Sequence, residues 1–235
     1  MPISSILSRR AFLSGAMAVL ATPYLSTPAH AVGPSLKRRI NHVRTAIDHS
    51  SSFNGTLHKN LMSAFADVVQ TDLGSIIEQS SFDEIIFEVN YWGSFKTSLI
   101  KPVTLVTGNC KEQLNQIAAQ LYTEAETNGG KEGTNLGLCM EDNLKDFSPS
   151  ASQTTLNIVT DDDSSRTDNF ILAFHQQKAQ EQNTRINGLI VGSPEALNGY
   201  FPKYVQTGPG SFTLPTENFN SLRAAWRQKF IQDLF

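Results

Sequence analysis

The residues of this chain best suited to chemistry follow an apolar segment near its start. Residues 40–47 lead into Asp48, Ser50 and Ser52, an acid and two hydroxyls at alternate positions. Because successive side chains of an extended strand point to opposite faces, these three side chains would point the same way. One carboxylate and two hydroxyls suit a hard divalent cation such as Mg²⁺, which takes oxygen ligands and keeps several waters. The same pattern also fits a serine-rich turn that caps the next helix.

Two further segments carry oxygen donors. Thr134 stands in a glycine-flanked loop before an expected helix, and Asp161 directly follows an expected strand. In an open parallel sheet, the loops that follow the strands rise from the same carboxyl edge. The sequence therefore predicts that two carboxylates and three hydroxyls meet there, with waters completing the shell of a Mg²⁺ ion.

Strands and helices alternate along the chain, as expected for one doubly wound α/β domain with a mostly parallel sheet, one antiparallel edge strand and helices on both faces. Pro102 favours the edge position for its strand, because proline cannot donate to a ladder. The first strand contains Asn41, His42 and Arg44, which is unusual for a central strand. Apolar periodicity predicts strands at 40–48, 82–92, 99–106, 155–160, 186–191 and 211–214. It predicts helices at 57–77 (continuing in broken form toward Ile77), 111–125, 138–147, 170–182 and 219–234, with 194–204 partly helical.

The start of the chain has the pattern of an export signal. Paired arginines (Arg9, Arg10), a short apolar run and an Ala-His-Ala sequence ending at Ala31 are typical of the twin-arginine type. The apolar run is shorter than the ~20 residues that a spanning helix needs. We expect a cleaved signal over 1–31, a single mature domain over 32–235 without a membrane span, and a periplasmic or secreted bacterial protein.

The net charge limits the kinds of partner that the chain can bind, and its two cysteines leave two redox states open. The formal net charge is −3, and it becomes −5 once the two arginines of the signal are removed. A mildly acidic chain without a Lys/Arg cluster is a poor candidate for binding nucleic acid or an anionic membrane. Cys110 and Cys139 could form one disulfide in an oxidising compartment or remain two separate buried thiols.

The order and context of these segments resemble a known site. Asp48-x-Ser50-x-Ser52, then Gly133–Asn135, then Thr160-Asp161 looks like the metal-ion-dependent adhesion site (MIDAS) of von Willebrand factor type A (VWA) domains. Over about residues 40–235 the chain is more closely similar to an uncharacterised bacterial exported family of VWA-like domains. The matching stretches are Val89–Gly93, Gly133–Phe147, Leu156–Asp161, Ile186–Leu189 and Gly208–Phe212.

The resemblance implies a Mg²⁺ ion, with Ca²⁺ or Mn²⁺ as alternatives. Its ligands would be the hydroxyls of Ser50, Ser52 and Thr134, with Asp48 and Asp161 acting directly or through water. Few direct carboxylates leave such an ion electropositive, so an acidic side chain of a protein partner can complete its shell. The family usually has a glycine after the Asp161 position, whereas this chain has two more acids. If the register slips by one residue, Asp162 is the ligand instead.

The leading hypothesis is therefore a protein-binding module and not an enzyme. A second hypothesis is a structural or assembly domain on the same scaffold whose site no longer binds metal. A hydrolase is a third, weaker one, since the chain has no Gly-x-Ser-x-Gly elbow and no His-Glu-x-x-His motif. His49 stands beside Ser50 as a candidate base, but neighbouring residues of a strand face opposite ways.

Overall fold

The structure, a computed structural model, describes residues 37–53, 55–127, 129–130, 133–161, 168–192, 199–216 and 219–235. The predicted signal over 1–31 lies outside these residues. The described strands form a six-stranded sheet in the order β3-β2-β1-β4-β5-β6. All neighbours pair in parallel except β2 and β3, which pair antiparallel, so the predicted sheet with one antiparallel edge strand is confirmed. The strands are β1 (Ile40–Asp48), β2 (Glu84–Trp92), β3 (Thr97–Val106), β4 (Gln153–Thr160), β5 (Thr184–Val191) and β6 (Thr213–Thr216).

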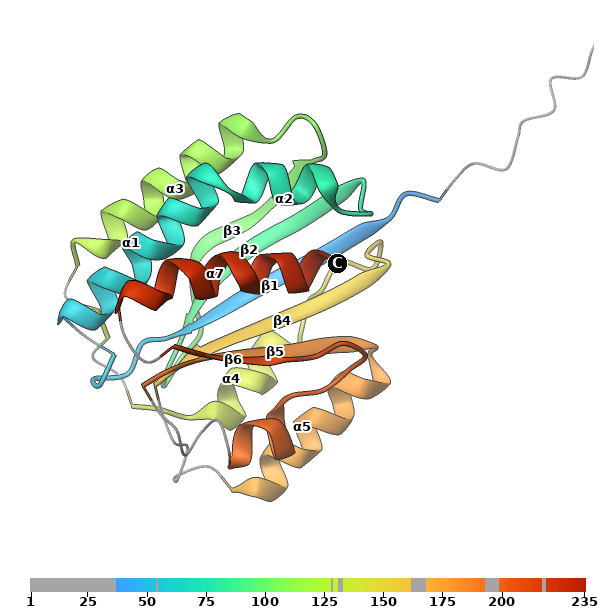
Figure 1. Ribbon diagram of the computed structural model, residues 1–235. Coiled ribbons are helices and arrows are strands. Elements are labelled where there is room, and N and C mark those ends of the chain that lie inside the picture. Colours follow the sequence, from blue (N-terminus) through green and yellow to red (C-terminus); the bar gives the residue numbers. More distant parts are fainter. Residues whose placement is uncertain are drawn as a thin grey trace, which may run out of the picture. The chain divides into compact units, whose positions relative to one another are not determined.

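Helices cover both faces of this sheet, as Figure 1 shows. Each face has its own cluster of buried apolar side chains, which joins the strands to the helices above them. On the first face the helices are α1 (Gly55–Thr71), α2 (Leu73–Gln79), α3 (Lys111–Ala125) and α7 (Phe219–Leu234). On the second face they are α4 (Leu136–Asn143), α5 (Asn169–Glu181) and the short π-helix η1 (Phe201–Val205). None of the described helices is both long enough and apolar enough to cross a lipid bilayer.

Three polar residues of β1, Asn41, His42 and Arg44, are compatible with a central position because each has a polar partner. His42 Nδ1 accepts a hydrogen bond from the Ser148 amide at 2.9 Å, and Arg44 forms an ion pair with Glu88 on the neighbouring strand. The Asn41 amide donates to the backbone carbonyl of Asp233 at 3.3 Å. Buried polar groups are tolerated when they are paired in this way. Every residue of β1 is therefore buried, although the strand is not a continuous apolar run.

Arg44 also explains why α4 ends earlier than predicted. Its guanidinium donates to the backbone carbonyls of Asn143 and Lys145 and lies 4.3 Å from the ring centroid of Phe147. The chain leaves the helix at Asn143, and Asp146 takes a positive φ of 59°. Residues 144–147, predicted to be helical, instead form a loop around the buried guanidinium.

The two cysteines are free thiols on opposite faces of the sheet. Cys110 belongs to the apolar cluster under α1, α3 and α7, and Cys139 belongs to the cluster under α4 and α5. The sheet lies between them, so the structure has the two separate buried thiols and not the disulfide.

A buried polar network attaches the C-terminal half of α7 to the sheet. Asp233 accepts hydrogen bonds from the amides of Asn157 and Asn187, at 2.7 and 2.8 Å. Lys229 donates to the Asn157 side-chain carbonyl, and its Nζ lies 3.6 Å from Asp233. Burial lowers the pKa of Lys229 to about 8.

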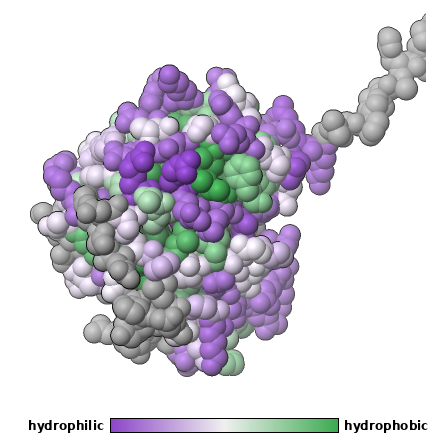
Figure 2. Space-filling model, viewed as in Figure 1, coloured by the Kyte–Doolittle hydropathy of each residue, from purple (hydrophilic) through white to green (hydrophobic). Residues whose placement is uncertain are grey.

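The outer surface on this side of the molecule is mostly hydrophilic, with small hydrophobic areas (Figure 2).

We expect Asp233→Ala to lower the free energy of unfolding by about 3–5 kcal/mol, because it leaves a buried ammonium without its carboxylate and two amides without an acceptor. Urea denaturation measures this. The control, Glu112→Ala on the exposed face of α3, should change the value by less than about 0.5 kcal/mol. Lys229→Met/Asp233→Leu removes both charges and should recover the part of the loss that comes from the unpaired ammonium. An Asp233→Ala variant as stable as the wild type would contradict this account of α7 docking.

Candidate metal site

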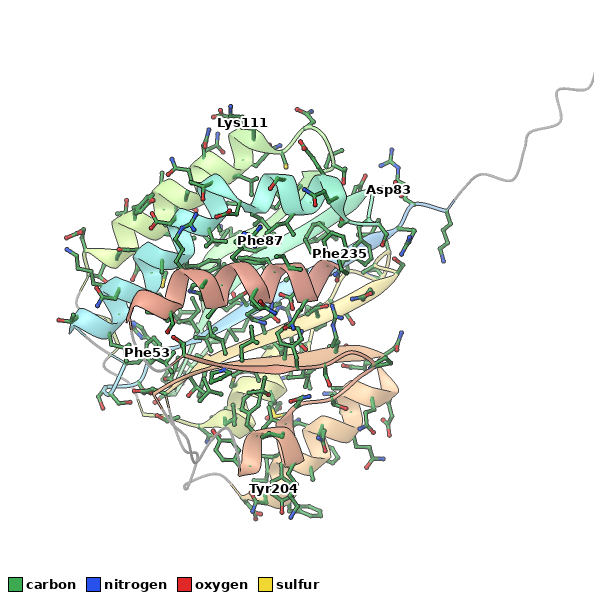
Figure 3. All side chains as sticks on the ribbon, in the orientation of Figure 1. Phe53, Asp83, Phe87, Lys111, Tyr204 and Phe235 are labelled. Atoms are coloured by element: carbon green, nitrogen blue, oxygen red, sulfur yellow. The ribbon has the colours of Figure 1, made fainter. Side chains whose placement is uncertain are left out.

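The candidate site lies at the carboxyl edge of the sheet, where β1 and β4 end side by side. In Figure 3, Phe53 marks the loop that follows β1, and Asp83 lies at the opposite end of the sheet, just before β2. Asp48 is the last residue of β1, and Asp161 is the first residue after β4. Their side chains come from adjacent parallel strands, as the sequence predicted.

Asp48 is fully buried and holds two different segments together. Its Oδ1 accepts a hydrogen bond from the Ser50 amide at 2.8 Å, which fixes the turn after β1. Its Oδ2 accepts one from the Thr160 hydroxyl at 2.7 Å, which ties that turn to the end of β4. Thr160 is not among the ligands predicted from the sequence, although it directly precedes Asp161.

Burial raises the pKa of Asp48 from 3.8 to about 7, even though the hydrogen bonds from Thr160 and Ser50 act in the opposite direction. The neighbouring charge of Asp161 raises it further. No ion pair among the described residues supplies a cation to this carboxylate. The ionised form of Asp48 would therefore be stabilised by a positive ion placed between the two acids.

The serine hydroxyls form a row from the buried acid to the surface acid. Ser50 Oγ lies 2.9 Å from Ser52 Oγ, and Ser52 Oγ donates to Asp161 Oδ1 at 3.1 Å. Ser50 is buried and Ser52 is exposed, so the row opens to solvent at its outer end. The structure thus brings together four of the five predicted ligands: Asp48, Ser50, Ser52 and Asp161.

Thr134 lies in the loop that reaches this site from α3. It is half-buried and directly precedes Asn135, whose side chain caps α4 by accepting a hydrogen bond from the Leu138 amide at 3.0 Å. Earlier in the same loop, Gly130 passes so close to the serine turn that a Cβ would lie 2.1 Å from the His49 carbonyl oxygen. The Thr134 hydroxyl makes no hydrogen bond to the other four side chains, all of which the structure describes. Asp162, the alternative ligand, lies outside the described residues.

His49 does not form a catalytic pair with Ser50. Its ring lies 4.4 Å from that of Tyr91, whose side chain belongs to the cluster on the α1 face, and Tyr91 Oη is 2.9 Å from His58 Nε2. The Ser50 hydroxyl instead contacts Ser52. The weak sequence argument for an activated serine therefore finds no support in the geometry.

The donor set suits a hard cation. The two carboxylates and two hydroxyls that the structure brings together are oxygen ligands of the kind that Mg²⁺, Ca²⁺ or Mn²⁺ prefers, and they include no thiolate or imidazole. In the described part of the chain, no group of three or more His, Cys, Asp or Glu side chains could hold a metal. An ion held here would therefore depend on hydroxyl ligands.

The chain belongs to the family described as "Protein of unknown function (DUF1194)", which matches residues 42–235. No curated protein matches its sequence.

Solved structures establish the class of fold, which is that of VWA domains. A von Willebrand factor type A protein from Catenulispora acidiphila is similar with a TM-score of 0.58 and 16% identity, covering 83% of this chain and 43% of that chain. The vWF domain of the type V pili tip protein Mfa5 from Porphyromonas gingivalis is similar with a TM-score of 0.54 and 12% identity, covering 83% of this chain and 95% of that chain. Proximal thread matrix protein 1 from the mussel byssus, with a zinc-occupied MIDAS motif, is similar with a TM-score of 0.50 and 13% identity. The match covers 82% of this chain and 46% of that chain. The chain thus spans less than half the length of the first and third of these.

We expect the metal-free protein to lose stability as the pH rises from about 4 to 7. The folded state keeps a proton on Asp48 that the unfolded chain releases near pH 3.8, so the contribution of this group falls by at most about 1.4 kcal/mol per pH unit. Asp48→Asn abolishes this titration, and its amide can still pair with Ser50 and Thr160.

The measurement is urea denaturation in EDTA at several pH values. The difference in unfolding free energy, Asp48→Asn minus wild type, should increase from pH 4 to pH 7. A difference that does not change with pH would show that Asp48 ionises normally in the folded protein.

Proposed function

We propose that this protein is an exported protein-binding module that holds a Mg²⁺ ion at the carboxyl edge of its sheet and uses it to engage an acidic group of a partner. The observation that carries the proposal is the convergence of Asp48, Ser50, Ser52 and Asp161, which come from two loops more than a hundred residues apart. The VWA fold places such loops at one edge, which supports the same reading.

Each residue has a distinct part in this proposal. The hydroxyls of Ser50, Ser52 and Thr134 would hold the ion directly, and Asp48 and Asp161 would hold it directly or through water. When bound, the ion supplies a positive charge that accepts an acidic side chain from outside. Thr160 and the Ser50 amide keep the Asp48 carboxylate oriented toward the serine row. The arrangement includes no nucleophile paired with a base, so the proposal is binding and not catalysis.

The choice of metal and the last ligand belong to the proposal as well. Mg²⁺ is preferred because it binds through few protein oxygens and keeps several waters, and Ca²⁺ or Mn²⁺ are the alternatives. Asp161 is preferred over Asp162 because its carboxylate already accepts a hydrogen bond from Ser52.

Export through the predicted twin-arginine signal to the periplasm or the cell exterior is also proposed. It is supported by one of the similar structures, Mfa5, which is a type V pili tip protein.

One observation favours a second candidate, a structural VWA scaffold that needs no metal. The hydroxyls of Ser50 and Ser52 and the Asp161 carboxylate already hydrogen-bond to one another, so the row is satisfied without an ion. Metal binding would have to replace these contacts. The two candidates therefore differ in one measurable property, the response of stability to Mg²⁺.

Thermal unfolding with and without Mg²⁺ tests the proposal. A ligand that binds only the folded state at 100 times its Kd stabilises by about 2.7 kcal/mol, which raises the Tm by several degrees. We expect this rise for the wild type and for the remote acidic variant Glu112→Ala, and not for Asp48→Ala. If Mg²⁺ shifts the wild type and Asp48→Ala equally, the ion does not bind at this site and the metal-free scaffold is the better reading.

A further inference from the structure

The exposed large hydrophobic side chains of the described residues are unevenly distributed. Five of the seven lie at the end of the sheet that carries the candidate metal site. Of the other two, Val106 pairs with Glu84 at the opposite end, and Phe235 ends the chain after α7, as Figure 3 shows. The five are Phe95, Leu138, Phe170, Ile171 and Phe174, which we call the apolar surface.

The largest part of the apolar surface is the start of α5. Phe170 and Phe174 are 78% and 59% exposed, and Ile171 lies between them. The inner side of the same helix is also apolar, since Leu172 is fully buried in the core. From 169 to 177 the helix has no Asp, Glu, Lys or Arg, and its one histidine, His175, is buried. A surface helix usually turns charged and polar residues outward, so an uncharged outer face with two exposed phenylalanines points to a contact surface.

Phe95 and Leu138 extend this surface toward the metal site. They line the same small crevice between the β2–β3 connection and α4, and they are 74% and 40% exposed. Leu138 is in the first turn of α4, four residues after Thr134. Phe95 follows β2 closely, and β2 ends at Trp92, which pairs in register with Asp48. Because α4 and α5 pack side by side, the five side chains lie on neighbouring elements.

We propose that the apolar surface is the second half of the partner-binding site, and that the partner is a protein presenting a carboxylate flanked by large apolar side chains. This inference rests on the proposed function of the metal site and specifies its ligand. A carboxylate that completes the shell of the ion would be common to every acidic partner, so it cannot select one of them by itself. Burial of aromatic and aliphatic side chains beside the charge supplies affinity and selects among the many acidic groups available.

The alternative occupants fit less well. A phospholipid surface would be favoured by lysines or arginines around the phenylalanines, but residues 169–177 of α5 include neither and the net charge of the chain is negative. A second copy of this chain would bring two acidic sites together. A partner with both an acidic and an apolar element complements the cation and the apolar surface at once.

A phage-displayed library of random, disulfide-constrained dodecapeptides provides the probe. The library is selected on the wild-type protein in Mg²⁺ and eluted with EDTA, and the enriched peptides are synthesised. We expect them to carry Asp or Glu next to Phe, Leu, Ile, Met or Trp. Phe170→Ser/Phe174→Ser should weaken their binding at least tenfold while keeping the wild-type Tm response to Mg²⁺. Val106→Ser/Phe235→Ser, which removes exposed hydrophobics at the other end of the sheet, should bind them like the wild type.

The outcomes separate this inference from the metal site itself. Acidic peptides that bind both double variants equally in Mg²⁺ would overturn the apolar surface and leave the proposed function intact. A wild-type protein that does not respond to Mg²⁺ would overturn the proposed function, and the inference with it. Failure to enrich any Mg²⁺-dependent peptide would overturn the inference. If the wild type sediments with phosphatidylglycerol vesicles and Phe170→Ser/Phe174→Ser does not, the apolar surface binds a membrane and the inference is wrong. If the wild type forms dimers and this double variant does not, the surface binds a second copy of the chain and the inference is also wrong.

Discussion

The burial of the Asp48 carboxylate is the constraint on which the site depends. An ionisable group without solvent must be neutral, paired or close to a cation, and here burial raises its pKa to about 7. Its two oxygens are occupied by the Ser50 amide and the Thr160 hydroxyl, so the turn after β1 cannot move independently of β4. These contacts fix the ends of the two strands and the row of serine hydroxyls in one arrangement around the Asp48 carboxylate. A positive ion in this position would stabilise the ionised carboxylate.

The rest of the fold keeps this edge in place by pairing polar groups within the core. β1 is one of the two central strands and carries the polar side chains of Asn41, His42 and Arg44, each with a partner elsewhere in the chain. On one face Arg44 and Glu88 fix the loop after α4, and on the other Asp233 and Lys229 fix α7 against β4 and β5. Such pairs add less stability than apolar packing would, but they allow fewer alternative arrangements.

Much of this could be predicted from the sequence, because local patterns encode it. Pro102 indicated the edge strand. The spacing of Asp48, Ser50 and Ser52 indicated a shared site, but the strand ends at Asp48 and Ser51 and Ser52 form a turn, so the extended backbone that the spacing argument assumed is wrong. What the sequence did not show depends on tertiary partners. The early end of α4 follows from the position of the Arg44 guanidinium, ninety-nine residues before Asn143 in the chain. The two cysteines are separated because they belong to apolar clusters on opposite faces of the sheet. Thr160 resembles any β-branched strand residue until its contact with Asp48 is seen.

The most direct test of the central claim is the anomalous scattering of a crystal soaked in Mn²⁺, an ion that accepts the same oxygen ligands. The account predicts one strong anomalous peak at the carboxyl edge of the sheet, within about 2.5 Å of the Ser50 and Ser52 hydroxyl oxygens and beside Asp48 and Asp161. A crystal that shows no peak there, or shows its strongest peak at another part of the molecule, would contradict it.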